Sequence, residues 1–322
     1  MQELSHRRPL PLSAFFYGAC YYPEHWDADT MAQDAARMRD CGFSLVRMGE
    51  FAWHLFEPEA GRFCFDWMDE AIARLAAAGI RTLLCTPTAT PPRWLTAAHP
   101  EVLRVAADGQ PLRHGSRQHA SHFSSVFRAH SRRITAALAA HYAGNPHVAG
   151  WQTDNEFHCH FAEDHHPEAQ TAFRDFLRER YANDLQALNR AWGGDFWAQA
   201  YTDFDQIETP IAHRPTHLNP SQVLDYQRFL SWGVARFQRE QVEILRAAQP
   251  AWWVTHNGCF ASIDYRGEFT RDLDFLSYDS YPFFDPQPAN RRFSHAFNLD
   301  WVRAYSGNFM IPEQQAGPGG QT

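Results

Sequence analysis

Apolar positions along the chain follow two alternating patterns, one with the period of a helix and one typical of buried strands. The longest helical pattern has apolar residues at successive spacings of 3, 4, 4 and 3, so that they share one face of a helix. These residues are Val223, Tyr226, Leu230, Val234 and Phe237. Asn219 and Pro220 ahead of them form a typical N-cap with proline at the first helical position. A long helix is therefore predicted to begin there and to end before Pro250.

Shorter helical segments alternate with short apolar runs of strand type. One helix is predicted to begin with a capping box of Thr30 and Gln33 and to run through Met38. Further helices are expected over residues 66–78 and 124–142 and near 298–305. Strands are expected over residues 15–21, 44–48, 81–85, 148–152, 252–256, 273–278 and 309–312.

This alternation of strand and helix implies a parallel sheet covered by helices, which is the α/β class. Without a nucleotide-binding fingerprint, seven or eight such units indicate a (β/α)8 TIM barrel. Seven strand patterns are found, and the sequence ends in GPGGQT soon after the seventh. Residues 1–14 precede the first strand pattern, and we expect them to be an N-terminal extension. Residues 15–322 are expected to form one barrel domain that is incomplete at its C-terminus, with the eighth βα unit missing.

Charge and composition exclude several classes of protein. The 322 residues carry 29 basic and 37 acidic side chains, a net charge of −8, and every basic residue is arginine. A chain without lysine forms no Schiff base and completes no phosphate-binding P-loop. The acidic balance argues against a nucleic-acid partner, because phosphate contacts need a clustered cationic face. Aromatic residues make up 15% of the chain, which suits either a large core or flat platforms for sugar rings.

The location of the protein is predicted from its cysteines and its apolar runs. The six cysteines lie far apart and form no CxxC motif, so we expect reduced thiols and neither a metal site nor a redox site. No secretory signal precedes the first prolines, and no apolar run approaches the length that a membrane span needs. A cytoplasmic protein without a membrane partner is expected.

Candidate chemistry gathers where the predicted strands end, because function in such a barrel lies at the carboxyl ends of its strands. Two glutamates occupy such positions on separate strands, Glu156 after the fourth and Glu313 after the seventh. A pair of carboxyl groups on one rim is what glycoside hydrolysis requires, one as acid and one as nucleophile. Other polar residues at strand ends are Arg47, Glu50, Asn257, Asp279, Ser280 and Tyr281.

Six motifs, in the same order along the chain, resemble the catalytic barrel of glycoside hydrolase family 42 β-galactosidases. They are ACYYPEHW (19–26), VRMGEFAW (46–53), TPTATPPRWL (86–95), WQTDNEF (151–157), YDSYP (278–282) and PEQQAGP (312–318). The resemblance extends from about residue 17 to the C-terminus. It implies a retaining enzyme that cleaves terminal β-D-galactosyl residues, without a cofactor.

The resemblance also implies roles for individual residues. Glu156 would be the general acid/base and Glu313 the nucleophile, with Asn155 holding the sugar 2-hydroxyl. Positions that line the galactose subsite in the family correspond to Arg117, Trp197 and Tyr281. We expect Arg47 to donate a hydrogen bond to the nucleophile and to keep it ionised, since a nearby cation favours a carboxylate.

The chain departs from the family pattern at several points. Pro312 stands where many members have methionine, and Ser121 stands where some have the first cysteine of a zinc site. We therefore expect no bound metal. A trimer like that of the family is expected only together with a downstream domain. A related glycosidase acting on another glycone, such as an α-L-arabinopyranoside, and an inactive sugar-binding barrel stay open as alternatives.

Three further groups of polar residues have simple interpretations. The histidines of residues 158–166 are interpreted as a polar loop over the rim of the active site rather than as metal ligands. Asp27, Asp29, Glu57 and Glu59 lie beside turns and helix starts, so capping or solvent-facing roles are expected. Arg132 and Arg133 are expected on a solvated helix face.

Overall fold

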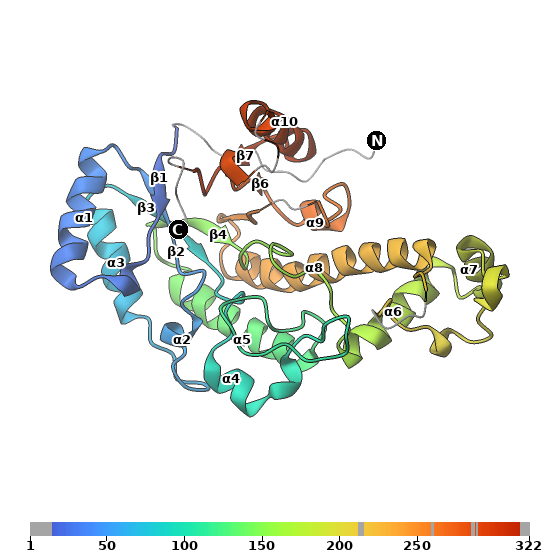
Figure 1. The fold of residues 1–322 in the computed structure, drawn as a ribbon. Coiled ribbons are helices and arrows are strands. Elements are labelled where there is room, and N and C mark those ends of the chain that lie inside the picture. The colour runs from blue at the N-terminus through green and yellow to red at the C-terminus, as the bar shows by residue number, and fades with distance from the viewer. Residues whose placement is uncertain (1–14, 212–215, 259–260, 285–286, 288, 316–322) are drawn as a thin grey trace.

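A computed structural model describes residues 15–211, 216–258, 261–284, 287 and 289–315 (Figure 1). The predicted extension over residues 1–14, Cys259 and the GPGGQT tail lie outside the described residues. The other five cysteines are free thiols. No described helix combines the length and the apolar character needed to span a membrane.

Each predicted strand segment contains a strand. In order they are β1 (Gly18–Cys20), β2 (Leu45–Met48), β3 (Arg81–Cys85), β4 (Val148–Gln152), β5 (Trp253–Thr255), β6 (Leu276–Ser277) and β7 (Phe309–Met310). The first five pair in sequence order in one parallel sheet, and β6 pairs in parallel with β7. Backbone hydrogen bonds from Asp274 N to Val254 O (2.9 Å) and from Ser277 N to His256 O (3.0 Å) link β5 with β6. This order confirms the predicted α/β class and TIM-barrel topology.

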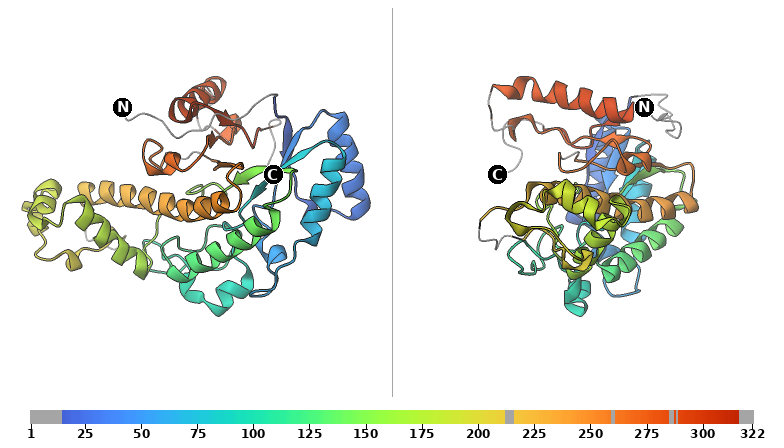
Figure 2. Two further views of the ribbon diagram at one scale, coloured as in Figure 1. Left: turned by 180° about the vertical axis from the view of Figure 1, so that it is seen from behind. Right: turned by 90° about the vertical axis from the view of Figure 1, so that its right-hand side faces the viewer.

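Helices follow the strands and cover them. They are α1 (Ala28–Asp40), α2 (Trp53–Phe56), α3 (Asp66–Ala77), α4 (Arg93–Ala98), α5 (Ser125–Tyr142), α6 (Pro167–Arg180), α7 (Leu185–Trp192), α8 (Pro220–Ala248), α9 (Glu268–Arg271) and α10 (Ser294–Ser306). Helix α1 packs against α3, α5 packs against α8, and α10 packs against the β6–β7 pair (Figure 1). Helices α6 and α7 lie at the far end of α8, away from the strands, in Figure 1 and in the left view of Figure 2.

The helix caps explain where the helices begin. The side chain of Asn219 accepts from Ser221 N (3.0 Å) and Gln222 N (3.3 Å) and Pro220 is the first residue of α8, as predicted. The predicted capping box of Thr30 and Gln33 is wrong. Asp27 Oδ1 accepts from Thr30 N (2.8 Å), so Asp27 is the N-cap and Thr30 lies inside α1. An aspartate three residues earlier satisfies the free N–H of Thr30 and starts the helix sooner.

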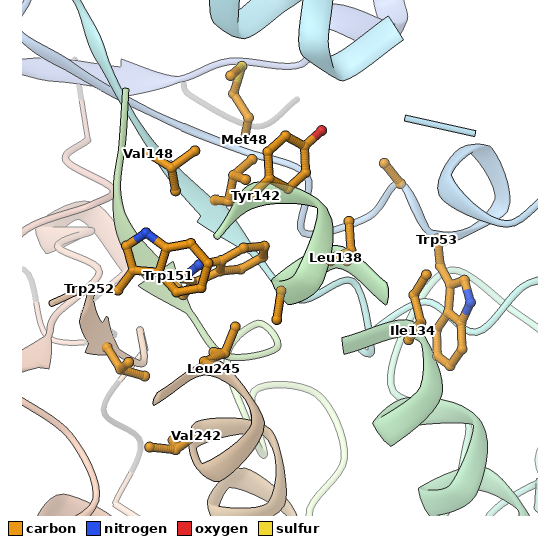
Figure 3. Close-up of a cluster of buried hydrophobic side chains, with 14 of the residues drawn as sticks. Met48, Trp53, Ile134, Leu138, Tyr142, Val148, Trp151, Val242, Leu245 and Trp252 are labelled. Atoms are coloured by element: carbon orange, nitrogen blue, oxygen red, sulfur yellow. The ribbon is translucent and has the colours of Figure 1, made fainter. Parts of the chain in front are cut away.

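The main core lies between the sheet and the helices that cover it, among them the paired helices α5 and α8. Figure 3 shows Ile134, Leu138 and Tyr142 of α5 and Val242 and Leu245 of α8 in the same cluster as strand residues. The strand side of this cluster includes Met48, Val148 and Trp151, and Trp252 lies just before β5. A second cluster, with Phe173, Leu188 and Phe229 among its buried residues, joins α6 and α7 to α8. The segment between β4 and α8 therefore has a core of its own.

Glu57 differs from its predicted solvent-facing or capping role. Its side chain is fully buried and accepts hydrogen bonds from Trp53 Nε1 (3.0 Å) and Gly61 N (2.7 Å). Arg133, expected on a solvated face, forms an ion pair with it from α5. A buried carboxylate needs a paired cation and hydrogen-bond donors. Its own neighbourhood supplies the donors, and α5 supplies the cation.

Candidate active site

A cleft of about 1710 Å³ lies at the carboxyl ends of the strands. Both predicted catalytic glutamates line it. Oxygens of Glu156, Asp279 and Glu313 lie within 4.8 Å of one another. Three carboxyl groups that follow β4, β6 and β7 therefore converge on one point of the cleft.

Glu313 is held by donors on both of its carboxylate oxygens. Arg47 Nη2 donates to Oε1 (2.6 Å), Tyr281 OH donates to Oε2 (2.6 Å), and Asn257 Nδ2 approaches Oε1 at 3.4 Å. Burial raises the pKa of Tyr281 above its ordinary value, and the hydrogen bond to Glu313 adds to the rise, so its hydroxyl keeps the proton that it donates. These donors fix the orientation of the Glu313 carboxylate and stabilise its negative charge.

Arg47 is a buried cation shared between two carboxylates. Its Nη2 also donates to Glu50 Oε1 (2.8 Å), and its Nη1 donates to Gln152 Oε1 (3.2 Å). Burial alone would lower the pKa of Arg47, but Glu50, Glu313 and neighbouring thiols outweigh it and raise the pKa well above the ordinary value. The guanidinium therefore stays charged beneath the cleft.

Glu156 is held by a different set of groups. Arg117 Nη1 donates to Oε2 at 2.9 Å, and Asn155 Nδ2 donates to the same oxygen at 3.3 Å. Its backbone has φ 46°, in the left-handed region, and its N–H donates to Asn257 Oδ1 (3.0 Å). Gln118 Nε2 donates to its carbonyl at 2.5 Å. Surrounding contacts thus hold the residue in a strained backbone conformation, as is common where a side chain must be aimed.

His256 supports the loop that carries Glu156. Its Nδ1 donates to Thr153 O (2.7 Å), which leaves Nε2 to accept from Phe157 N (3.1 Å). Burial lowers the pKa of His256 to about 3. The ring is therefore neutral, and its protonation would remove the acceptor that Phe157 uses.

We expect the protein to lose stability in acid partly through His256. Between pH of about 6.5 and 3 the unfolded chain binds a proton at this residue and the folded chain does not, so the free energy of unfolding falls as pH falls through that window. His256 is expected to change the free energy of unfolding by about 1.4 kcal/mol per pH unit within that window. Chemical denaturation between pH 7 and 4.5 measures it. His256→Asn should make the free energy of unfolding depend less steeply on pH, whereas His147→Asn, at an exposed position, should leave the slope unchanged. Equal slopes for the wild type and both variants would contradict the contribution of His256.

The structure brings most of the predicted site residues together and leaves one apart. Arg47, Arg117, Asn155 and Tyr281 all contact Glu156 or Glu313 through the bonds described above. Trp197 does not reach the cleft: it is 62% exposed and stacks on Phe196 with ring centroids 4.5 Å apart. It follows α7 on the segment that packs against the far end of α8. That segment extends away from the strands, so this chain's cleft is built without Trp197.

The histidine loop makes separate contacts. His158 Nδ1 contacts Ser262 Oγ (3.1 Å), His165 Nδ1 contacts Thr209 Oγ1 (2.7 Å), and His166 Nε2 contacts Glu101 O (2.6 Å). His160 Nε2 meets Arg117 Nη2 at 2.5 Å, and it lies with Cys159 and Glu156 in a group whose ligand-type atoms are within 4.8 Å of one another. Within the loop, Cys159 and His160 line the cleft. His165 and His166 are bonded to residues outside the cleft lining, and His166 also caps α6.

Two polar residues have a larger part in the site than the sequence indicated. Asn257 contacts the Asn155 side chain (3.0 Å), Asp279 (2.7 Å), Glu313 and the backbone of Glu156. Asp279 completes the carboxyl cluster. The sequence identifies both as polar residues that follow strands, and that position is the available signal for their part in the site.

Comparisons with known proteins give matches over nearly the whole chain. A model of the glycoside hydrolase 42 family, described as β-galactosidase, matches residues 20–321. A β-galactosidase of Thermus thermophilus is 47% identical to this chain over an alignment of 323 positions. The alignment covers 94% of this chain and 49% of that protein. The chain thus spans about half the length of the curated relatives it matches.

Solved structures extend the likeness to the fold. A polyextremophilic β-galactosidase from the Antarctic haloarchaeon Halorubrum lacusprofundi matches with a TM-score of 0.88 and 40% identity, over 94% of this chain and 47% of that one. The catalytic domain of a β-amylase from Paenibacillus polymyxa, at 12% identity and a TM-score of 0.69, shares the fold alone. The family model covers nearly the whole chain and the motif residues converge in the cleft, so the chain belongs to glycoside hydrolase family 42.

Proposed function

We propose that this chain carries the catalytic site of a retaining glycosidase that cleaves terminal β-D-galactosyl residues. The observation that carries the proposal is the separation of the two glutamates, whose nearest oxygens lie within 4.8 Å. Retaining enzymes have carboxyl groups about 5–5.5 Å apart, whereas inverting enzymes need about 6.5–9.5 Å to admit a water molecule. The short separation supports direct attack by a carboxylate.

In the first step, Glu313 acts as nucleophile and Glu156 as acid. The Glu313 carboxylate attacks the anomeric carbon while the bond from that carbon to the aglycone oxygen breaks, and Glu156 gives its proton to the departing oxygen. Arg47 and Tyr281 hold the attacking carboxylate in place. The products of this step are the free aglycone alcohol and a glycosyl ester of Glu313.

In the second step, water cleaves the ester. Glu156, now a carboxylate, removes a proton from water as the water oxygen attacks the anomeric carbon, and Glu313 leaves as a carboxylate. Both residues return to their starting protonation states. Two inversions at the anomeric carbon leave the β configuration unchanged.

The support for galactose as the glycone comes from relatives. Proteins similar to this chain over more than nine-tenths of its length are named as β-galactosidases. An α-L-arabinopyranoside has the same ring hydroxyls as a β-galactoside but lacks the hydroxymethyl group. Comparison of the two substrates therefore tests the part of the cleft that would receive that group.

The test is hydrolysis of nitrophenyl β-D-galactopyranoside by the chain, followed by proton NMR of the first sugar formed. We expect β-galactose to appear first and α-galactose to follow by mutarotation. Initial formation of α-galactose would contradict retention, and faster turnover of the arabinopyranoside would contradict the glycone. Binding of galactose without hydrolysis of either substrate would identify an inactive sugar-binding barrel.

A further inference from the structure

Asp279 belongs to the carboxyl cluster of the cleft, yet the two-glutamate mechanism gives it no task. It follows β6, and its side chain is 7% exposed. Asn257 Nδ2 donates to its Oδ2 at 2.7 Å. Its Oδ1 is buried, and no described residue donates to it. A buried carboxylate oxygen without a donor is unfavourable, whereas a protonated oxygen beside another carboxylate is satisfied by donating.

The charges around Asp279 make full ionisation of the cluster unfavourable. Arg47 is already shared by Glu50 and Glu313, and Arg117 is paired with Glu156. The titratable and charged groups that face Asp279 from the packed elements are Cys20, Arg47, Glu156, Cys159, Tyr281 and Glu313. Burial raises the pKa of Asp279 well above its ordinary value; Glu313 and Glu156 add to the rise, and Arg47 opposes it. A third ionised carboxylate would therefore have no cation of its own.

We propose that Asp279 and Glu156 share one proton, and that Asp279 acts as a positioning residue that keeps an acidic proton available at Glu156. The inference rests on the proposed function, in which Glu156 must be protonated before the glycosidic bond breaks. Oxygens of the two carboxyl groups lie within 4.8 Å of each other in this buried cluster. Two carboxyl groups so close together titrate as a pair, and the second proton is lost only at raised pH.

The proposed pair of Asp279 and Glu156 explains how Glu156 can keep a proton although Arg117 lies beside it. Arg117 donates to its carboxylate at 2.9 Å, and a cation at that distance favours the ionised form, which is not an acid. A neighbouring carboxyl group that repels a second negative charge favours retention of one proton. The proton can then pass to Glu156 when the departing oxygen is in place.

The charge of the cluster also stays constant through the first step. Before cleavage, ionised Glu313 and the half-protonated pair carry two negative charges together. After cleavage, the Glu313 ester is neutral and the pair, having given its proton to the aglycone, carries both charges. Because the cluster is buried beside fixed cations, a step that keeps its total charge avoids a large electrostatic cost.

The test is the pH profile of kcat/KM for Asp279→Asn. Asparagine keeps the shape of the side chain and can still contact Asn257, but it removes the titrating group and offers Glu156 an N–H donor. The alkaline limb, which reports loss of the acidic proton, should move to lower pH by about one pH unit or more. Asp274→Asn is the matched control. Asp274 is buried, accepts from Val254 N (2.8 Å) and Arg246 Nη2 (3.1 Å) and lies outside the cleft lining, so the limb should not move.

A purely structural role for Asp279 would lower activity without moving the limb, and that result would overturn the proposal. A second measurement needs no turnover: infrared titration of the C=O band of protonated carboxyl groups in the full chain. Both Asp279→Asn and Glu156→Gln should make a protonated band disappear at lower pH than in the wild type. A band unaffected by Glu156→Gln would show that the proton belongs to Asp279 alone. Absence of hydrolysis by the wild type would count against the proposed function and leave this titration as the test of the pair.

Discussion

Glu313→Ala is expected to lower kcat for nitrophenyl β-D-galactopyranoside by about 10⁴-fold or more, the order of loss that follows removal of a catalytic nucleophile. The substitution removes the atom that forms the covalent bond and leaves Arg47 without one of its two carboxylate partners. Steady-state kinetics of the purified variant measure the loss. Exposed Glu59→Ala is the matched control and should retain the activity of the parent chain.

Azide separates a nucleophile from a residue that merely supports the site. In Glu313→Ala a small anion can enter the space of the missing carboxylate and attack the anomeric carbon directly, with one inversion. The expected product is α-galactosyl azide, identified by NMR. Formation of the β-azide would mean that a glycosyl ester still forms on another residue, and Glu313 would then not be the nucleophile.

The framework of the barrel could be predicted because its signals are local. Strands that are buried on both faces appear as short apolar runs, and helix α8 carries both a regular apolar face and the Asn219 cap. The sequence patterns do not predict that α6 and α7 pack with the far end of α8 as a separate unit. Its core depends on contacts between segments far apart in sequence, for example Phe173 with Phe229, which local periodicity does not reveal.

The site was predictable to the extent that strand ends identify it. Glu156, Glu313 and Arg47 follow or lie in strands, and barrel topology alone brings them to one rim. The burial of Glu57 was missed because its cation, Arg133, lies on another helix. The task of Asp279 was missed for a related reason: what matters is the distance to other carboxyl groups, and sequence does not give that distance.

Glu156→Gln is expected to affect substrates according to their leaving groups. Glutamine keeps the shape of the side chain and a contact with Arg117 but cannot give a proton to the departing oxygen, so cleavage of an alkyl galactoside such as lactose should slow by about 10²–10⁴-fold. A dinitrophenyl galactoside has an acidic leaving group that departs as an anion and needs little protonation, so its first step should slow far less. The ester should then accumulate, which gives a burst of dinitrophenol followed by slow turnover in stopped-flow kinetics. An equal loss for both substrates would mean that Glu156 supports the site without supplying the proton.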